Sequence, residues 1–263
     1  MNKIQLIIGL VVAAFSLLSY FGSSSVNPIT GEKQHVAGMS PKDEVAMGLQ
    51  SAPQMAAQMG GLTQDARARQ LVSTIGAKVV AGSVASKSGY PFKFHTLADP
   101  RTVNAFALPG GQIFITMALL SRLETEGQLA AVLGHEVGHV IGRHSAEHIA
   151  KDQLTQGLTG AFAMGAGSMS AAQIGQMVGQ SIMLKYGRDD ELEADALGLR
   201  LMAEAGYDPR AMIRVMQILE KASGGARVPE YGSSHPSPPH RIEEINAKLT
   251  KAFPNGIPAG LKP

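Results

Sequence analysis

The architecture of this chain follows from one short stretch, His135-Glu136-Val137-Gly138-His139, an H-E-x-x-H motif in a segment of helical periodicity. Residues four positions apart lie on one face of a helix, so both imidazoles can bind a single zinc ion. Glu136 then projects toward the remaining metal position and can accept a proton from a water molecule there. A motif this short also arises by chance, so the rest of the chain must supply the other parts of the site.

The helix that carries the motif is expected to begin at a capping box, because Thr125 lies three residues before Gln128. Apolar residues recur at helical spacing and form one stripe, which consists of Leu129, Leu133, Val137, Val140 and Ile141. Both histidines fall well off this stripe, and Glu136 falls at its edge. The pattern predicts a helix with a buried back and a metal-binding face that lines a cleft.

A third protein ligand is needed, because a catalytic zinc ion usually takes three and leaves one position for water. The best candidate is Glu191, in the sequence ELEAD at residues 191–195. Asp195, one turn further along, can accept the outer N–H of a ligand histidine and fix its tautomer. Glu193 is the rival, but it points about 200° away around the helix. Without a metal, residues 189–195 would be an acidic helix N-terminus stabilised by the helix dipole.

Other histidines offer further ligands. A three-histidine site of the H-E-x-x-H-x-x-G-x-x-H class would need histidine where this chain has Ser145, although Gly142 fits that class. His144 and His148 are therefore expected to be exposed or to contact the site only from outside. His235, on a loop before the last predicted helix, either lies at the surface or reaches the metal. At the metal it would stabilise the oxyanion or fill the open coordination position.

The remaining periodicity predicts a mostly helical α+β fold with a small sheet. Helices are expected at about 40–59, 63–82, 189–206 and 239–249, with another that begins near 209. Short strands are expected at 92–97, 103–108 and 112–116, with a turn at Pro109-Gly110-Gly111. Residues 151–184 are rich in Gly, Ala and Met and are expected to be helical. They would form a buried hairpin, a lid that contacts substrate or membrane, or an oligomer contact.

The N-terminus carries an apolar segment. Lys3 precedes an uncharged run, residues 4–21, that would extend about 27 Å as a helix, close to the hydrocarbon thickness of a membrane. Residues 1–25 are therefore expected to be a signal peptide or a membrane anchor, and membrane association would run through residues 4–21. A linker is expected at 26–38, the catalytic domain at 39–252 and a tail at 253–263.

Composition excludes several classes of site. Lys and Arg number 23 against 21 Asp and Glu, and no basic stripe with interleaved aromatics is present, so nucleic acid is not an expected partner. Cysteine is absent, which excludes disulfides, thiolate ligands and a cysteine nucleophile. A metal must therefore be bound by His and carboxylate side chains.

Several motifs together resemble the HtpX/CAAX-prenyl-protease type of zinc metallopeptidase, a gluzincin family, and in particular its small exported bacterial branch. The resemblance covers the chain from Asn27 to about Leu249. Besides H-E-x-x-H and ELEAD, it rests on Asn27-Pro28-Ile29-Thr30-Gly31, Asn104-Ala105-Phe106 with Pro109-Gly110-Gly111, and Ser234-His235-Pro236 with Arg241-Ile242. Unlike many relatives, the chain has no cysteine for acylation and no tetratricopeptide tail.

The resemblance implies a zincin-like domain that binds one Zn²⁺ per chain through His135, His139 and Glu191, with Glu136 as general base. It also implies that Asn104 and His235 line the cleft near the reacting carbonyl. Residues 112–116 resemble the edge strand of zincins, which holds an extended substrate by main-chain hydrogen bonds.

The expected function is zinc-dependent endopeptidase cleavage of unfolded or misfolded cell-envelope proteins, because strand addition reads the backbone more than side chains. The protein would be periplasmic, or membrane-anchored and facing the periplasm. An alternative is a latched zinc protein in which His235 closes the site and the Met-rich segment binds apolar clients, as in a chaperone.

Overall fold

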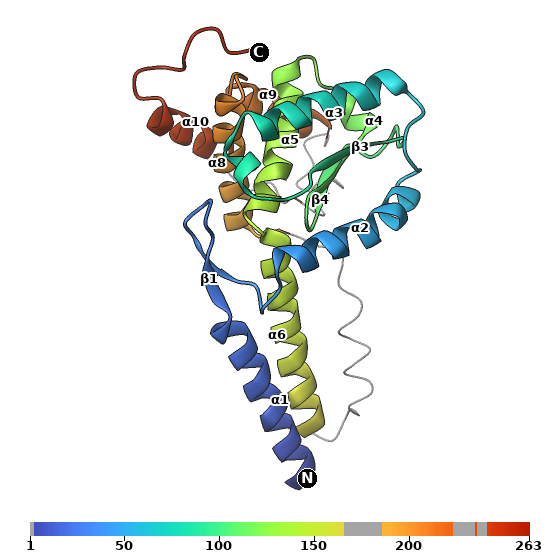
Figure 1. The fold of residues 1–263 in the computed structure, drawn as a ribbon, viewed down its shortest axis with the longest axis vertical. Coiled ribbons are helices and arrows are strands. Elements are labelled where there is room, and N and C mark those ends of the chain that lie inside the picture. Colours follow the sequence, from blue (N-terminus) through green and yellow to red (C-terminus); the bar gives the residue numbers. More distant parts are fainter. Residues whose placement is uncertain (1–2, 166–185, 223–234, 236–240) are drawn as a thin grey trace. The chain divides into compact units, whose positions relative to one another are not determined.

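The computed structural model describes residues 3–165, 186–222, 235 and 241–263 (Figure 1). The chain divides into two compact units, one of residues 1–40 and 144–184 and one of residues 41–143 and 185–263. The second unit contains the H-E-x-x-H motif and the first contains the apolar N-terminal segment.

The second unit is mostly helical, which confirms the predicted α+β class. Its α-helices are α2 (Pro41–Gln58), α3 (Ala66–Ala81), α4 (Met117–Leu120), α5 (Glu126–Ile141), α8 (Arg188–Glu204), α9 (Ala211–Ala222) and α10 (Arg241–Ala252), and a 3-10 helix spans Val84–Lys87. The Thr125 side chain accepts a hydrogen bond from the backbone N–H of Gln128, so the predicted cap starts α5. Asp65 caps α3 in the same way, which is why α3 starts later than residue 63.

The sheet consists of β3 (Lys93–Leu97), β4 (Ala105–Leu108) and β5 (Gln112–Thr116), in the order β3-β5-β4. The turn at Pro109-Gly110-Gly111 joins β4 and β5 as antiparallel neighbours, and β3 pairs with β5 in parallel. The prediction that residues 112–116 form an edge strand is therefore wrong, because β5 has a neighbour on each side. A turn signal defines the hairpin but does not determine on which side of it a third strand pairs.

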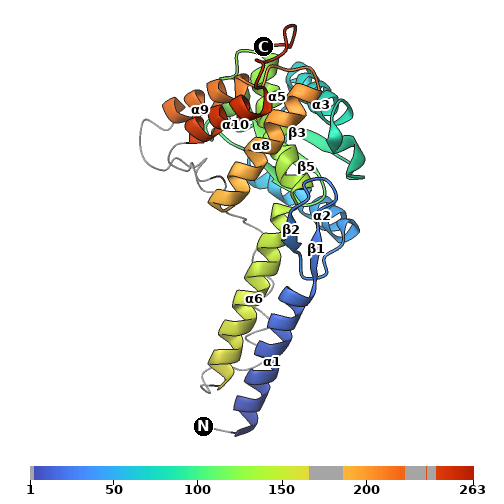
Figure 2. The ribbon, with the colours of Figure 1, turned by 90° about the vertical axis from the view of Figure 1, so that its left-hand side faces the viewer.

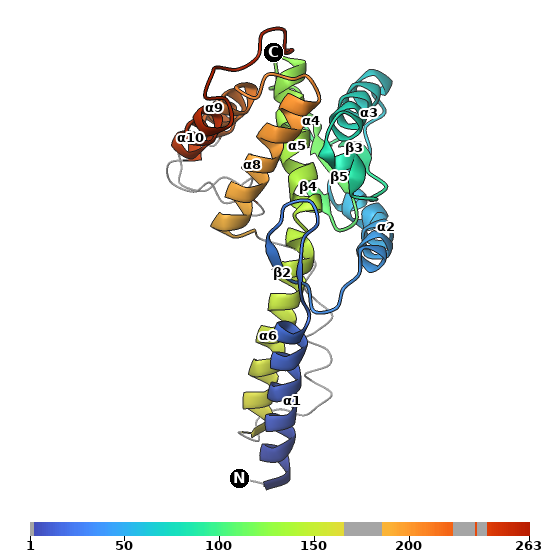
Figure 3. The ribbon, with the colours of Figure 1, turned by 60° about the vertical axis from the view of Figure 1, so that its left-hand side comes forward.

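The motif helix α5 is the centre of the second unit, and every residue from Gly127 to Ile141 is buried. Figures 2 and 3 show α8 on one side of α5 and the sheet with α3 on the other. The predicted apolar stripe faces this core, where Leu129, Leu133 and Val137 are almost fully buried. Burial of such side chains contributes roughly 1.5–3 kcal/mol each, so the motif stands on a rigid support.

Glycines bring α5 and α8 close together. A Cβ atom on Gly138, inside the motif, would lie 3.0 Å from the backbone oxygen of Ala194 on α8. One on Gly198 of α8 would lie 3.2 Å from the backbone nitrogen of His135. Close approach of the two backbones places side chains from both helices in one small space.

A buried ion pair fixes α2 to the end of α5. Glu44 on α2 is 1% exposed, and it accepts hydrogen bonds from Arg143 Nε at 2.7 Å and from the Tyr90 hydroxyl at 3.1 Å. Arg143 follows the C-cap residue of α5 and has a left-handed backbone, with φ of 59°. Burial raises the pKa of Glu44, although Arg143 and Tyr90 both act to lower it. The carboxylate therefore depends on both partners to remain charged in this environment.

Glu44→Ala should lower the free energy of unfolding by about 3 kcal/mol, because it leaves the Arg143 guanidinium without its buried partner. Urea denaturation followed by circular dichroism measures this change. Gln50→Ala, at an exposed position of the same helix, is the matched control and should change stability little. Equal stability of the two variants would contradict a supporting role for the ion pair.

The first unit contains α1 (Lys3–Gly22), β1 (Ser24–Val26), β2 (Lys33–His35) and α6 (His144–Gly165). The strands form a small antiparallel hairpin within and beside the predicted linker. Helix α6 agrees with the helical prediction for residues 151–165. Residues 166–184 of the predicted helical segment lie outside the described residues. His144 is buried, so of the two positions predicted for it the exposed one is wrong. Among the described residues, α1 alone is long and apolar enough to cross a membrane, judged by length and composition.

Candidate metal centre

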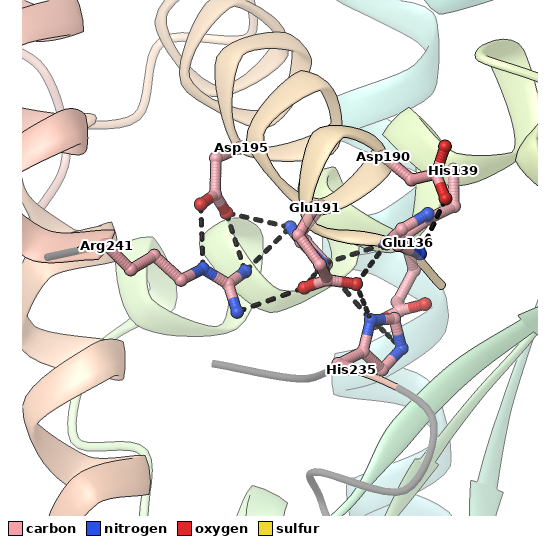
Figure 4. Close-up of polar contacts among 9 residues, drawn as sticks. Glu136, His139, Asp190, Glu191, Asp195, His235 and Arg241 are labelled. Atoms are coloured by element: carbon pink, nitrogen blue, oxygen red, sulfur yellow. Dashed lines mark hydrogen bonds and ion pairs between the residues drawn. The ribbon is translucent and has the colours of Figure 1, made fainter. Parts of the chain in front are cut away.

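Two helices supply the candidate metal centre in the second unit. Helix α5 carries His135, Glu136 and His139, and α8 carries Glu191 and Asp195 (Figure 4). All five side chains are buried. The histidines lie one turn apart on α5, and the close packing of α8 brings its first turn against them. The residues that the two sequence motifs supply therefore lie together in the structure.

Three side chains have donor atoms at zinc-ligand spacing. The Nε2 atoms of His135 and His139 are 3.0 Å apart, and the two oxygens of Glu191 lie 3.5 Å and 3.3 Å from them, respectively. Ligands about 2.1 Å from a tetrahedral zinc ion are separated by roughly 3.3 Å. The observed spacing fits that geometry, with nitrogen and carboxylate donors of the kind zinc prefers. Glu193, the rival ligand, does not belong to this cluster of potential ligands.

His235 also belongs to the cluster. Its Nδ1 lies 2.7 Å from Glu191 Oε1 and 3.5 Å from His135 Nε2, and its side chain is fully buried. One ligand atom from each of His135, His139, Glu191 and His235 lies within 4.8 Å of the others. The structure thus places His235 in the buried cluster and not at the surface. The rest of its predicted loop lies outside the described residues.

Glu136 is buried beside the cluster with 0% exposure, and neither of its carboxylate oxygens accepts a hydrogen bond from the described residues. The Nε2 atom of His235 lies 3.6 Å from Oε1 of Glu136. Burial raises the pKa of Glu136. A buried carboxylate without hydrogen-bond donors is costly, which fits a group that acts on a ligand or water in the site.

Asp195 and Arg241 form an outer layer around the ligands (Figure 4). Asp195 Oδ1 lies 3.0 Å from His135 Nδ1, as predicted for a residue that fixes the histidine tautomer. Arg241 on α10 donates Nε to Oδ2 and Nη2 to Oδ1 of Asp195, both at 2.7 Å, and its Nη1 lies 3.0 Å from Glu191 Oε2. One buried guanidinium therefore contacts both carboxylates of α8.

These contacts set the pKa values of the cluster. Burial lowers the pKa of His135, but hydrogen bonds to Asp195 and Glu191 outweigh it and raise the pKa to about 9. Burial holds the pKa of His139 well below its usual range. Burial raises the pKa of Glu191 and Asp195, yet cationic neighbours, His235 for Glu191 and Arg241 for Asp195, leave both pKa values lowered. Both carboxylates are thus charged, as a zinc site requires.

Sequence reasoning missed two residues at this site. Arg241 entered only through the resemblance, without a role, because no local spacing shows that α10 reaches α8. Tyr186 was not singled out at all. Its buried ring stacks on the His139 imidazole, with centroids 3.9 Å apart and an angle of 18°, and it lies 5.2 Å from the His235 ring. Its place directly before the N-cap of α8 was the available signal.

Asn104 precedes β4, where its backbone exchanges hydrogen bonds with Thr116. Its side chain is buried, and its Oδ1 accepts no hydrogen bond from the described residues. A place near the reacting carbonyl remains a prediction for this residue. His144 and His148 belong to the first unit and are not part of the ligand cluster.

Asp195→Asn should weaken zinc binding about 10–100-fold, because the neutral amide no longer supports His135 as a ligand. Competition with a fluorescent zinc chelator measures the affinity directly. Asp189→Asn, at an exposed position of the same helix, should leave the affinity unchanged. Equal affinities for both variants would remove Asp195 from the site.

Comparisons with known proteins agree with this geometry. A model of peptidase family M48 matches residues 65–249. The chain is 34% identical over 184 residues to mitochondrial metalloendopeptidase OMA1 of Schizosaccharomyces pombe, which covers 69% of this chain and 53% of that protein. It is 29% identical over 203 residues to the beta-barrel assembly-enhancing protease of Escherichia coli, which covers 73% and 41%. The chain thus spans about half or less of the length of these relatives.

Proposed function

This chain belongs to peptidase family M48 and its cofactor is zinc, and from this premise we propose that it is an endopeptidase of unfolded or misfolded cell-envelope proteins. The observation that carries the proposal is the buried cluster of His135, His139 and Glu191, with the carboxylate of Glu136 beside it. Ligands from two helices and an adjacent base are what metal-assisted hydrolysis needs.

In the proposed reaction His135, His139 and Glu191 hold the zinc ion. A zinc ion bound there would polarise the scissile carbonyl and lower the pKa of water. Glu136 accepts a proton from the attacking water while the oxygen of that water bonds to the carbonyl carbon. Glu136 then delivers that proton to the amide nitrogen as the C–N bond breaks, so that the products are a carboxylate and an amine. Asp195 and Arg241 hold His135 and Glu191 in place throughout.

Asn104 and His235 are proposed to act on the substrate side. As the carbonyl oxygen becomes negative, a donor from either side chain would stabilise it. The short distance between His235 and Glu191 supports a second role, in which His235 fills the fourth metal position until substrate displaces it. In both roles His235 lies near the metal. It would fill the fourth metal position when substrate is absent and stabilise the oxyanion when substrate is bound.

Strand β4 is the proposed binding edge for substrate, in place of β5. Among the described residues β4 pairs only with β5, so its other edge has no strand partner there. Strand β4 also packs against α5, the helix that carries the H-E-x-x-H motif. An extended segment added to β4 would be held through its backbone, which favours unfolded chains over folded ones.

The cell envelope is the proposed location. The apolar helix α1 supports export or anchoring, and the name of the Escherichia coli relative links that protein to β-barrel assembly. We therefore propose that this chain acts on envelope proteins and associates with the membrane through residues 4–21.

The test is cleavage of unfolded casein by the purified full chain, with metal-depleted, zinc-restored and Glu136→Gln protein in parallel. Cleavage should disappear on zinc removal, return with zinc, and be absent from Glu136→Gln. Cleavage that survives in the Glu136→Gln protein would contradict the proposal. If no preparation cleaves casein while wild type and Glu136→Gln suppress client aggregation equally, the client-binding alternative replaces it.

A further inference from the structure

Helix α1 has the dimensions and surface of a membrane-spanning helix. It has 20 residues, and its most apolar window of 18 residues has a mean hydropathy of 2.2 and is only 6% buried. Twenty helical residues extend about 30 Å, the thickness of the bilayer hydrocarbon. Large apolar side chains such as Leu10, Phe15 and Leu18 are exposed on it. A cleaved signal peptide would share these properties, so α1 alone does not decide between the two.

Helix α6 carries a surface that fits α1. The two helices run side by side in opposite directions within the first unit (Figures 1 and 2). A Cβ atom on Gly157 of α6 would lie 2.1 Å from Ser16 Oγ of α1, so any larger residue would force the Ser16 side chain to move. Ser16 donates its hydroxyl hydrogen to the Val12 carbonyl and needs no water. Small residues at close backbone contacts are typical of helix pairs in membranes.

The charges of α6 are confined to its beginning. Glu147, Lys151 and Asp152 lie in the first three turns, and residues 153–165 carry no charge. Phe162, in the uncharged part, is 79% exposed, and Leu158 one turn before it is also exposed. Together with the apolar surface of α1, these side chains form a patch too large to be expected facing water.

Polar and aromatic groups gather at one end of this helix pair. The Tyr20 ring stacks on His35 at 4.9 Å, and the backbone N–H of His35 donates to Glu147 Oε1 at 2.8 Å. Phe21 packs beside the same ring. Aromatic residues followed by charges are typical of the membrane–water boundary. The boundary would thus lie where α1 ends and α6 begins.

We propose that the lipid bilayer covers this pair, so that α1 and the uncharged part of α6 form a membrane-embedded helical hairpin and α1 is retained in the mature protein. The described uncharged part of α6 extends about 20 Å, so it enters the hydrocarbon without crossing it. The close fit at Gly157 supports retention, because a cleaved segment needs no complementary surface on the mature chain. This inference concerns the first unit and does not depend on the peptidase chemistry.

The first test is the state of the N-terminus and the behaviour of the protein in membranes. The chain is expressed with its own N-terminus in a bacterial host, and its intact mass is measured. We expect residues 3–22 to be present and the protein to remain with membranes during alkaline carbonate extraction. A mature chain that begins after residue 22 and is released by carbonate would overturn the proposal.

The second test places α6. Since the chain has no cysteine, Phe162→Cys and Lys151→Cys each give one labelling site. In vesicles of phosphatidylethanolamine and phosphatidylglycerol, a bimane label at position 162 should be quenched by nitroxide lipids several-fold more than one at position 151. The label at position 162 should also be protected from iodide, a water-soluble collisional quencher. Equal exposure of both positions to water, or protection of position 162 only by a bound protein and not by vesicles, would overturn the proposal.

A third variant tests the pairing itself. Gly157→Leu should increase the exposure of a position-162 label to water, because the leucine side chain cannot fit against Ser16. Thr155→Leu, at an exposed position of the same helix, is the control. Zinc content and casein cleavage measured in detergent should be unchanged in both, which separates failure of the hairpin from failure of the proposed peptidase function. An unchanged label in Gly157→Leu would contradict the pairing.

Discussion

Glu136→Gln should lower the rate of peptide hydrolysis by about 10²–10⁴-fold while the protein still binds one zinc ion. The amide has nearly the same shape as the carboxylate but cannot accept the proton of the attacking water. Glu136 is fully buried, beside the three ligands and not among them, so its replacement leaves the metal donors intact. The measurements are kcat/KM on a fluorescent peptide and zinc content by atomic absorption.

The control for this prediction is a variant that loses the metal. His139→Ala should lose both zinc and activity, whereas Glu136→Gln should lose activity alone. A Glu136→Gln protein without zinc would show that the carboxylate supports metal binding. A fully active one would show that another group accepts the proton.

Arg241→Leu should destabilise the zinc-free protein by about 3–5 kcal/mol, because it removes the buried guanidinium that contacts the carboxylates of both Asp195 and Glu191. Asp195 would lose both of its hydrogen bonds to the guanidinium, and Glu191 would lose its ion pair. The cost of burying the two carboxylates would then be offset only by the nearby histidines. Zinc should restore part of the stability, because the ion supplies positive charge at the same place.

Urea denaturation with and without zinc measures this effect. Lys251→Leu, at an exposed position of the same helix, should change stability by no more than about 0.5 kcal/mol. Arg241→Lys keeps the charge but cannot make the two parallel hydrogen bonds, so it should fall between wild type and Arg241→Leu. An unfolding midpoint of Arg241→Leu equal to that of Lys251→Leu would show that Arg241 does not stabilise the site.

The sequence was sufficient for the parts of the protein that depend on local spacing. The family, the α+β class and the start of α5 at Thr125 were predicted correctly, because a capping box, a helical stripe and a two-histidine motif are all readable within a few turns. Glu191 could be selected because a carboxylate and Asp195 lie one turn apart on another helix. The structure brings these residues together in the predicted combination.

Features that depend on distant contacts could not be predicted in the same way. The central position of β5 follows from its parallel pairing with β3. No residue of either strand indicates that β3 pairs with β5 and not with β4. Arg241 and Tyr186 are single residues whose importance arises only when α10 and the start of α8 pack against α5. The two-unit division likewise depends on the pairing of α1 with α6, which are more than a hundred residues apart in sequence.

The position of α6 in the chain has a further consequence for assembly of the metal centre. The proposed ligands His139 and Glu191 stand on either side of about fifty residues that include α6. An ion bound to both would close that stretch into a loop in the folded protein, and its binding free energy would add to the free energy of folding. Loop-closure entropy grows only slowly with length, so insertions between α5 and α8 would cost little stability. Changes in the part that we propose to lie in the membrane could therefore accumulate in evolution without loss of the proposed metal centre.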